Sequence, residues 1–300
     1  MSYPSTERSE GGPAIHAGMA AFADHFDGYI LDLWGVLHDG VTAFPQALDC
    51  LQRLRRAGKR ILILSNAPRR TAEVAGRCAE LGLTPDTYDL LMSSGEEAWR
   101  HLKERPDDWH RALGPRCFHL GPERDMGMRD GLDHRFVDDL AQADFILLTG
   151  ALQQADTRET YTALLESALA RGLPMVCANP DYVVIRGGAE EICAGTIALA
   201  YEDMGGDVRY HGKPHTGIYR TCLGLFDGIP AERILAVGDS VRTDIVGAQS
   251  MGVQSVFVVS GIHEAKLVSA ETGAVDQDRL AELYRAEGGT PLAALPTFRW

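Results

Sequence analysis

Residues 28–40 read GYILDLWGVLHDG, and the expected fold of the chain follows from this stretch. It opens with the apolar run YIL, whose β-forming residues suit a buried parallel strand. Asp32 comes where such a strand would end, and open α/β sheets bind their ligands at that end. Gly35 then allows the chain to turn sharply. Taken alone, an Asp after an apolar run is explained equally well as an ordinary turn residue.

Three further stretches place polar residues in comparable positions. They are ILILSN at 61–66, HGKP at 211–214 and ILAVGDSVRTDI at 234–245. The first and the third are apolar runs that end in a polar residue, Ser65 and Asp239 respectively. Together with Asp32, the three stretches supply a hydroxyl, the ammonium group of Lys213 and a further pair of carboxylates. This ordered set of chemical groups favours a ligand site over an isolated turn.

The ordered set resembles the haloacid dehalogenase superfamily of hydrolases, which use an aspartate as nucleophile. The long segment between Ser65 and Lys213, with Asn179-Pro180-Asp181 inside it, is similar to that of subfamily IIA. Phosphatases acting on p-nitrophenyl phosphate, nucleotides, pyridoxal phosphate and phosphoglycolate belong to this subfamily. The resemblance implies an α/β fold, in which a Rossmann-like, doubly wound parallel sheet carries an inserted α/β cap domain of the C2 type.

The resemblance also implies which residues carry out the chemistry. Asp32 would be the nucleophile that forms an aspartyl-phosphate, as carboxylates do in other phosphoryl transfers. Ser65 would donate a hydrogen bond to a phosphate oxygen, and Lys213 would bring positive charge to the nucleophile and the phosphate. Phosphoryl transfer needs such charge neutralisation and usually Mg²⁺. The expected activity is therefore that of a phosphate-monoester phosphatase.

The expected metal site consists of oxygen ligands, which Mg²⁺ prefers. By resemblance, Mg²⁺ would be held by the carboxylates of Asp32 and Asp239 and by the backbone carbonyl of Trp34. Asp244 has two interpretations that the sequence leaves open. It lies near the metal in the family pattern, but it is equally well explained as a carboxylate at the start of a helix, facing the helix dipole.

Substrate contacts are expected from the residues that follow the second strand and from the cap. Asn66 and Arg69 come just after that strand, although a solvated loop explains Arg69 as well. Asn179 and Asp181 resemble a motif at which the subfamily's cap rejoins the active site, whereas the alternative is an ordinary Asn-Pro turn. Arg186 could contact an anionic substrate or lie in solvent.

Trp34 departs from the family pattern. Phosphatases of the superfamily usually carry an Asp there, which acts as general acid and base, while an indole N–H can only donate a hydrogen bond. Such catalysis contributes about 10²–10⁴-fold to rates. Three outcomes stay open: a weak phosphatase or one whose leaving group needs no proton, replacement of the acid by His38 or Asp39, and a non-catalytic protein that binds a phosphometabolite or a protein partner.

A dehalogenase is a further alternative, because an aromatic residue occupies the position of Trp34 in the superfamily's dehalogenases. Those enzymes carry a helical cap before the Ser motif and need no metal. Here the long insertion follows Ser65, and the Gly-Asp-Ser motif around Asp239 is present. Both features favour phosphate chemistry.

The composition is that of a globular protein with an acidic balance. The chain has 300 residues, of which 45% are hydrophobic and 24% charged, and its formal net charge is −13. This charge argues against nucleic acid or an anionic membrane as the main partner. A small phosphorylated metabolite, the partner that the resemblance implies, would have to be attracted by local positive groups.

No targeting or membrane segment is expected. Apolar runs are too short to span a bilayer, and residues 1–18 show no basic stretch followed by an apolar one. The six cysteines are scattered without a Cys-x-x-Cys pair, which favours reduced, mostly buried thiols over zinc or disulfides. We therefore expect a cytoplasmic protein, and subfamily IIA adds the expectation of a homodimer formed through the cap.

Apolar periodicity and Gly positions predict alternating strands and helices, which argues for parallel sheets covered on both faces. Strands are predicted over 59–64, 90–94, 116–120, 144–149, 175–178, 208–211, 234–237 and 253–259. Helices are predicted over 45–57, 71–81, 95–104, 161–171, 193–203, 217–226, 244–251 and within 276–300. The expected domains are a flexible tail (1–18), a core in two parts (19–105 and 207–300) and the cap (106–206).

Overall fold

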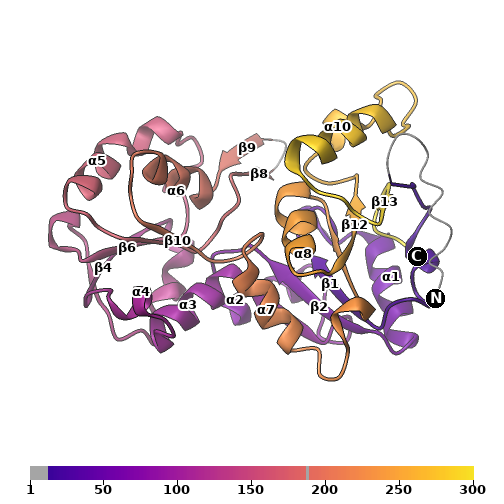
Figure 1. Ribbon diagram of the computed structural model, residues 1–300, viewed down its shortest axis with the longest axis horizontal. Helices are drawn as coiled ribbons and strands as arrows, with labels where there is room; N and C mark the ends of the chain where they lie inside the picture. The colour runs from indigo at the N-terminus through magenta and orange to yellow at the C-terminus, as the bar shows by residue number, and fades with distance from the viewer. Residues whose placement is uncertain (1–12, 187–188) are drawn as a thin grey trace. The chain divides into compact units, whose positions relative to one another are not determined.

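The structure, a computed structural model, describes residues 13–186 and 189–300 (Figure 1). The chain forms two compact units by its internal contacts. The first comprises Met1–Ser65, Ala75–Met92 and Tyr219–Trp300, and the second comprises Asn66–Val74 and Ser93–Ile218. Each unit contains its own sheet with helices, so the predicted α/β class with a second α/β unit is confirmed. The predicted cap over 106–206 lies within the second unit.

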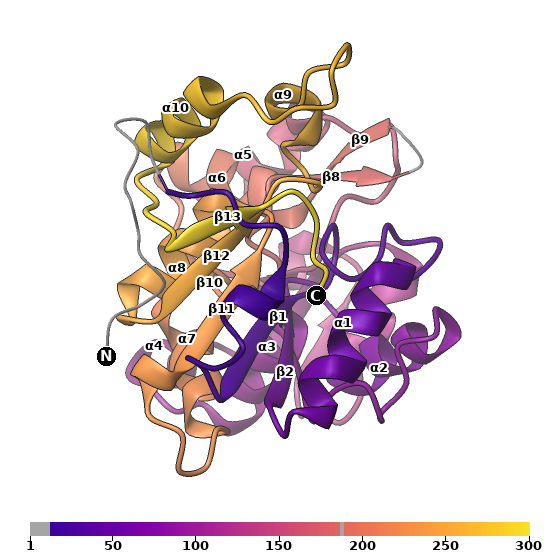
Figure 2. The same ribbon diagram turned by 90° about the vertical axis from the view of Figure 1, so that its right-hand side faces the viewer.

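The first unit is built on a six-stranded sheet with β1 near its middle (Figure 2). In spatial order the strands are β13 (Ala293–Leu295), β12 (Gln254–Val258), β11 (Ile234–Gly238), β1 (Gly28–Asp32), β2 (Arg60–Ser65) and β3 (Leu90–Ser93). The pairs from β13 to β2 are parallel. The chain runs from β1 to β2 on one side and returns to β11 on the other. The order therefore reverses at β1, which is where doubly wound sheets bind ligands.

The helical elements of this part of the chain follow the predicted periodicity with one correction. They are α1 (Pro45–Arg56), α2 (Thr71–Glu80), α7 (Thr216–Gly224), a π-helical turn (Val241–Ile245), α8 (Val246–Ser250), α9 (Glu264–Leu267) and α10 (Gln277–Glu287). The helix predicted over 244–251 is thus divided. In the π-helical turn the hydroxyl of Tyr219 donates to the carbonyls of Thr243 and Asp244, at 3.2 and 3.1 Å. This contact satisfies carbonyls that a regular helix would use internally.

The C-terminal segment adds a strand that periodicity did not predict. Strand β13 lies in the Pro-containing tail beyond α10 and pairs with β12. Ile15 forms a bridge to Ala294, and the N–H of Met19 donates to the carbonyl of Arg299 at 2.7 Å. The described end of the predicted tail over 1–18 is therefore paired with the C-terminal segment, while residues 1–12 lie outside the described residues.

The second unit is built on a five-stranded sheet whose neighbouring pairs are all parallel. In spatial order the strands are β10 (Val208–Tyr210), β7 (Met175–Cys177), β6 (Phe145–Leu148), β4 (Arg116–Leu120) and β5 (Arg135–Val137). Strand β5 was not predicted. The antiparallel pair of β8 (Val183–Arg186) and β9 (Ala189–Ile192) was not predicted either. The helices are α3 (Ser94–Glu104), α4 (Asp108–Arg111), α5 (Thr162–Ala170) and α6 (Ala194–Asp203).

Strand β6 shows why this sheet is buried on both faces. Ile146 and Leu148 pack in one cluster with residues of α5 and α6, whereas Phe145 and Leu147 pack in another with residues of α3. Successive side chains of a strand point to opposite faces, so a continuous apolar run requires cover on both sides. The run FILL therefore fits a central parallel strand, as the sequence predicted.

Two further expectations concern the cysteines and the membrane-spanning segments. All six cysteines are buried, which confirms the expectation of mostly buried thiols. Over 13–186 and 189–300, no helix has the length and apolar character that crossing a membrane would require.

Candidate active site

Three carboxylates come together in the first unit. Asp32 ends β1, Asp239 follows β11, and Asp244 lies in the π-helical turn. One oxygen from each lies within 4.8 Å of one from each of the others, and the residues are only 8%, 5% and 3% exposed. The parallel pairing of β1 with β11, in which Leu31 is opposite Val237, brings the strand ends to the same edge of the sheet.

Main-chain donors fix two of these carboxylates. The Oδ2 of Asp239 accepts a hydrogen bond from the N–H of Ile262 at 2.8 Å. The Oδ2 of Asp244 accepts one from the N–H of Ser240 at 3.1 Å. The Ser240 hydroxyl itself accepts from the N–H of Thr243 at 3.3 Å, as a helix cap does. Such outer contacts orient side chains for a metal ion.

The carboxylate cluster fits a hard divalent cation. Three buried anions within 4.8 Å repel one another strongly unless a cation or protons neutralise them. Carboxylate oxygens are the ligands that Mg²⁺ and Ca²⁺ take in proteins. Asp244 belongs to this cluster, which favours the metal interpretation over the helix-dipole interpretation. A contribution from the Trp34 carbonyl stays a prediction.

Gly35 and Gly261 leave room for the Asp239 carboxylate. A Cβ added to Gly35 would lie 2.1 Å from Oδ2 of Asp239, and one added to Gly261 would lie 2.0 Å from it. Gly35 also has a φ of +79°, a conformation that L side chains rarely adopt. The turn after β1 therefore needs glycine for its backbone conformation and for its close approach to Asp239.

We expect Gly35→Ala to displace Asp239 and weaken metal binding. The positive φ costs about 1–2 kcal/mol of folding free energy with a side chain, and the clash with Asp239 adds to this cost. The melting temperature with and without Mg²⁺ measures both effects. Gly58→Ala is the matched control, since its φ is +71° but no described heavy atom lies within 4 Å of an added Cβ. Equal Mg²⁺ stabilisation of Gly35→Ala and wild type would contradict this expectation.

Ser65 ends the strand next to Asp32. In the pairing of β1 with β2, Asp32 is opposite Leu64, so Ser65 lies one position further along. Ser65 is buried. Its hydroxyl is therefore delivered at the same sheet edge as the carboxylate cluster, as the sequence predicted for strands that run parallel.

The loop that carries Lys213 is fixed within the second unit. Its three successive backbone N–H groups, from His211, Gly212 and Lys213, each donate to a different acceptor. The acceptors are the carbonyl of Cys177 at 2.9 Å, Oε2 of Glu97 at 2.8 Å and Oδ1 of Asn66 at 2.8 Å. The position of the loop is thus set by partners far away in the sequence.

Asn66 joins this loop to the Asn179–Asp181 turn. Its amide nitrogen donates to the Lys213 carbonyl and to Oδ1 of Asp181, both at 2.9 Å. Oδ1 of Asn179 accepts from the N–H of Asp181 at 3.0 Å, which closes the turn. The structure thus gathers Asn66, Asn179, Asp181 and Lys213 in the second unit. The side-chain amide of Asn66 therefore binds the main chain of Lys213.

Comparison with known proteins decides the family. Residues 29–133 match the family described as haloacid dehalogenase-like hydrolase, and 210–283 match a second, HAD-hydrolase-like family. Human chronophin is 30% identical over 272 residues, covering 86% of this chain and 89% of that protein. The chain belongs to the haloacid dehalogenase superfamily.

Solved structures support the same assignment. A haloacid dehalogenase-like hydrolase from Brucella suis 1330 shares 32% identity with a TM-score of 0.81, covering 95% of this chain and all of that one (100%). A glycerol phosphate phosphatase from Mycobacterium tuberculosis, solved in complex with calcium, shares 25% identity with a TM-score of 0.62, covering 86% and 76%. Within the superfamily, the predicted subfamily IIA is confirmed, and the protein is a hydrolase of the phosphatase type.

In this superfamily member, Trp34 packs on the turn that follows β1. Its ring lies edge-on to His38, with ring centroids 5.3 Å apart, and a Cβ added to Gly40 would lie 2.2 Å from it. Nδ1 of His38 accepts from the N–H of Gly40 at 2.8 Å, and burial lowers the pKa of His38 to about 4. Asp39 is exposed and accepts from two N–H groups of the same turn. Both candidate replacement acids therefore hold the turn together.

Arg69 and Arg186 were both considered as possible substrate contacts, and the structure describes the side chain of only the first. Arg69 pairs with Asp125, with Nε 3.4 Å from Oδ1, and Asp125 is buried. Arg69 is therefore held by an ion pair rather than lying in a solvated loop. The side chain of Arg186 lies outside what the structure describes.

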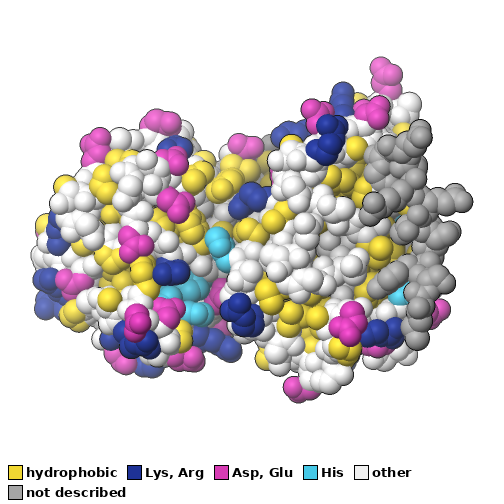
Figure 3. All heavy atoms as spheres, in the orientation of Figure 1, with side chains coloured by type: hydrophobic (Ala, Val, Ile, Leu, Met, Phe, Trp, Pro, Cys, Tyr) yellow, Lys and Arg dark blue, Asp and Glu magenta, His cyan; other side chains and the backbone are white. Residues whose placement is uncertain are grey.

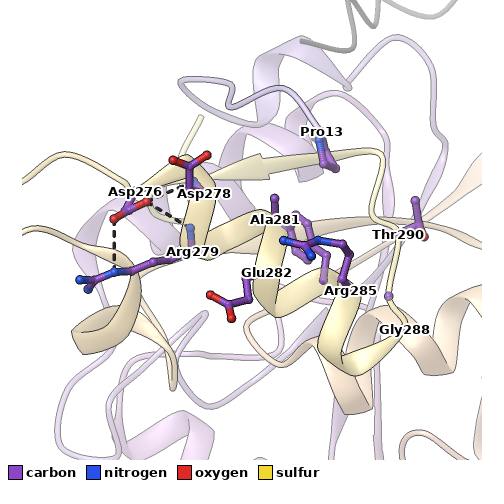
Figure 4. A pocket seen from close by; sticks show the side chains of 11 residues that line it. Pro13, Asp276, Asp278, Arg279, Ala281, Glu282, Arg285, Gly288 and Thr290 are labelled. Atoms are coloured by element: carbon purple, nitrogen blue, oxygen red, sulfur yellow. Dashed lines mark hydrogen bonds and ion pairs between the residues drawn. The ribbon is translucent and has the colours of Figure 1, made fainter. Parts of the chain in front are cut away.

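A surface hollow lies away from the predicted residues. It has a volume of about 1070 Å³ and runs along α10, with charged side chains on its wall (Figure 4). Oδ1 of Asp276 accepts from the N–H of Asp278 and Arg279 at 3.1 Å and so caps the helix. The described lining includes no predicted site residue.

The sequence did not lead us to one cluster of potential metal ligands. Glu97, His101 and His211 each offer a ligand atom within 4.8 Å of the others. The spacing of Glu97 and His101 on a predicted helix was the available signal. His211 comes from a distant segment that only the tertiary structure brings close.

Proposed function

We propose that the protein is a Mg²⁺-dependent phosphate-monoester hydrolase that reacts through an aspartyl-phosphate on Asp32. The observation that carries this proposal is the buried cluster of Asp32, Asp239 and Asp244 at the edge where β1 meets β11. A cluster of acidic groups at a switch point of an α/β sheet suits a metal-assisted phosphoryl transfer.

The reaction divides into two displacements at phosphorus. An oxygen of Asp32 attacks the phosphorus, the P–O bond to the leaving group breaks, and the alcohol oxygen departs with the electron pair. Water then attacks the phosphorus of the aspartyl-phosphate, which releases inorganic phosphate and restores the carboxylate. Mg²⁺, held by the three carboxylates and the Trp34 carbonyl, would supply charge neutralisation for both displacements.

Lys213 is proposed to bring the positive charge that phosphoryl transfer requires, which is the role that the family resemblance gives it. Support comes from the fixed loop and from the burial of Lys213, which is 3% exposed, since a buried ammonium requires an anionic partner. Asn66, which binds the main chain of Lys213 on both sides, follows Ser65 directly in the chain. We assign Asn66 the role of positioning Lys213, in place of direct substrate binding.

We propose that Trp34 occupies the position at which phosphatases of the superfamily usually carry the acid-base Asp, and that it cannot perform that role. An indole cannot accept a proton, and Nδ1 of His38 and Oδ1 of Asp39 both accept main-chain N–H groups of the same turn. Turnover is therefore fastest for esters whose leaving group departs without protonation. Among natural compounds, the substrate class is a small phosphorylated metabolite, as the activity of the Mycobacterium tuberculosis relative, a glycerol phosphate phosphatase, suggests.

The test of the metal proposal is hydrolysis of p-nitrophenyl phosphate with Mg²⁺. We expect turnover that EDTA abolishes and Mg²⁺ restores, and Asp239→Asn should raise the Mg²⁺ concentration for half-maximal rate by about 10–100-fold. Asp278→Asn, an exposed carboxylate on α10, is the matched control and should behave as wild type. Turnover that persists in EDTA would refute the role of the metal.

A further inference from the structure

A second cluster of metal-ligand side chains lies in the second unit. Glu97 and His101 are four residues apart on α3 and so share one face of the helix, and His211 follows β10. One ligand atom of each lies within 4.8 Å of one from each of the others. Glu97 and His211 are buried, while His101 is partly exposed. Figure 3 shows histidine side chains gathered at the surface over α3.

The hydrogen bond of His101 fixes its tautomer. Nδ1 of His101 lies 2.9 Å from the backbone carbonyl oxygen of Glu97. A carbonyl oxygen can only accept, so Nδ1 carries the proton. The lone pair of the neutral ring is therefore on Nε2.

The tautomer of His211 follows from a chain of two contacts. Nδ1 of His110 lies 2.8 Å from Oδ1 of Asp107; although partial burial opposes it, the hydrogen bonds from His110 lower the pKa of this carboxyl to about 2. Asp107 therefore accepts, and the lone pair of neutral His110 is on Nε2. Nε2 of His211 is 3.2 Å from that atom and must donate to it. The lone pair of His211 is thus on Nδ1.

Two acceptors consequently face each other in the interior. Nδ1 of His211 lies 3.7 Å from Oε2 of Glu97, a distance too long for a direct hydrogen bond. The same oxygen accepts from the N–H of Gly212, so the carboxylate is held in place. A positive ion between these atoms would pair with both acceptors.

We propose that Glu97, His101 and His211 bind a transition-metal ion of the zinc type, through Oε of Glu97, Nε2 of His101 and Nδ1 of His211. Two imidazole nitrogens and one carboxylate oxygen suit Zn²⁺, which takes N and O ligands in tetrahedral geometry, with water as a fourth ligand. Each histidine ligand donates its other N–H to an oxygen or to a ring nitrogen, as metal-bound histidines do. This site uses no residue of the carboxylate cluster of the first unit, and Zn²⁺ binding to it can be measured without substrate turnover.

The ion would attach the Lys213 loop to α3. His211 is two residues before Lys213, and the N–H of Gly212 already binds Glu97 of α3. A metal bridge between Glu97, His101 and His211 would fix the same loop through side chains. The role that follows is structural, because it holds a loop in position without contact to substrate.

The test is metal binding by tag-free, chelator-treated protein. We expect one Zn²⁺ per chain in the presence of saturating Mg²⁺, and Co²⁺ should give the visible absorption of a tetrahedral site. His101→Gln should weaken Zn²⁺ binding on the order of 100-fold, and Asp107→Asn, which disrupts the hydrogen-bonded chain behind His211, about 10–100-fold. Asp239→Asn should leave the Co²⁺ band intact, since it alters the other cluster.

His119→Gln is the matched control, because His119 is buried in the same unit and contacts Thr149 instead of the cluster. It should bind Zn²⁺ as wild type does. The proposal is overturned if wild type binds no stoichiometric Zn²⁺, if Co²⁺ gives only the weak spectrum of an octahedral ion, or if His101→Gln retains wild-type affinity. Should His101→Gln fail to fold, unchanged affinity in Asp107→Asn, an exposed position, overturns it instead.

Discussion

Asp32→Asn is expected to lose at least about 10⁴-fold in turnover of p-nitrophenyl phosphate, because an amide cannot form the covalent intermediate. Asp32 ends the central strand β1 and lies within 4.8 Å of two further carboxylates. The substitution removes one of three buried negative charges, so it should not unfold the protein. Rates are measured with Mg²⁺ in excess, and acid-quenched enzyme is examined for phosphate attached to the chain.

The melting temperature provides the control for this variant. Without metal, Asp32→Asn should melt close to the wild-type temperature, since the amide keeps the shape of the carboxylate and repulsion with Asp239 and Asp244 is relieved. A large loss of activity at unchanged stability then reports on chemistry alone. A variant that keeps more than about 1% of wild-type turnover, or a wild type that never carries phosphate, would exclude Asp32 as nucleophile.

Trp34→Asp is expected to accelerate hydrolysis of alkyl phosphates by about 10²–10⁴-fold, because it introduces a carboxyl group that can transfer a proton to the leaving alcohol. The gain with p-nitrophenyl phosphate should be much smaller, since nitrophenolate departs without a proton. Glycerol phosphate and p-nitrophenyl phosphate therefore form the diagnostic pair. The ratio of their rates, measured in both enzymes, isolates the proton transfer from metal and phosphate binding.

Trp34→Phe serves as control, because Trp34 packs against His38 and Gly40 and its loss alters the turn. Phe reproduces the loss of indole without adding an acid, so it should show no gain. If wild type is inactive while Trp34→Asp is active, the natural protein binds phosphometabolites or a protein partner without turning substrates over. Equal rates for Trp34→Asp and Trp34→Phe with glycerol phosphate would refute the proposed role of this position.

Local sequence was sufficient for the strands that deliver the candidate site. The run YIL before Asp32, ILIL before Ser65 and ILAVG before Asp239 form β1, β2 and β11. Parallel strands whose carboxyl ends share an edge then place these residues together, so the carboxylate cluster followed from strand order and resemblance. The two interpretations of Asp244 could not be separated in this way, because they differ in a contact across the fold.

Helix boundaries and strands that depend on partners distant in the sequence were predicted less well. The π-helical turn over Val241–Ile245 is stabilised by Tyr219, and β13 exists because it pairs with β12. Neither partner can be read from the periodicity of the segment itself. The same applies to Arg69, whose ion pair with Asp125 joins segments that the sequence keeps apart.

The sequence by itself determined the class of the fold, the strands that carry the candidate site and the residue types at their ends, because apolar periodicity and Gly turns act over a few neighbouring positions. Tertiary structure alone decided which side chains meet. Glu97 binds the N–H of Gly212, 115 positions away, and Asn66 binds the main chain of Lys213 at a separation of 147. Such contacts form only when packing brings separate segments together, so local sequence could indicate Glu97 and His101 on one helix but neither their meeting with His211 nor the fixed Lys213 loop.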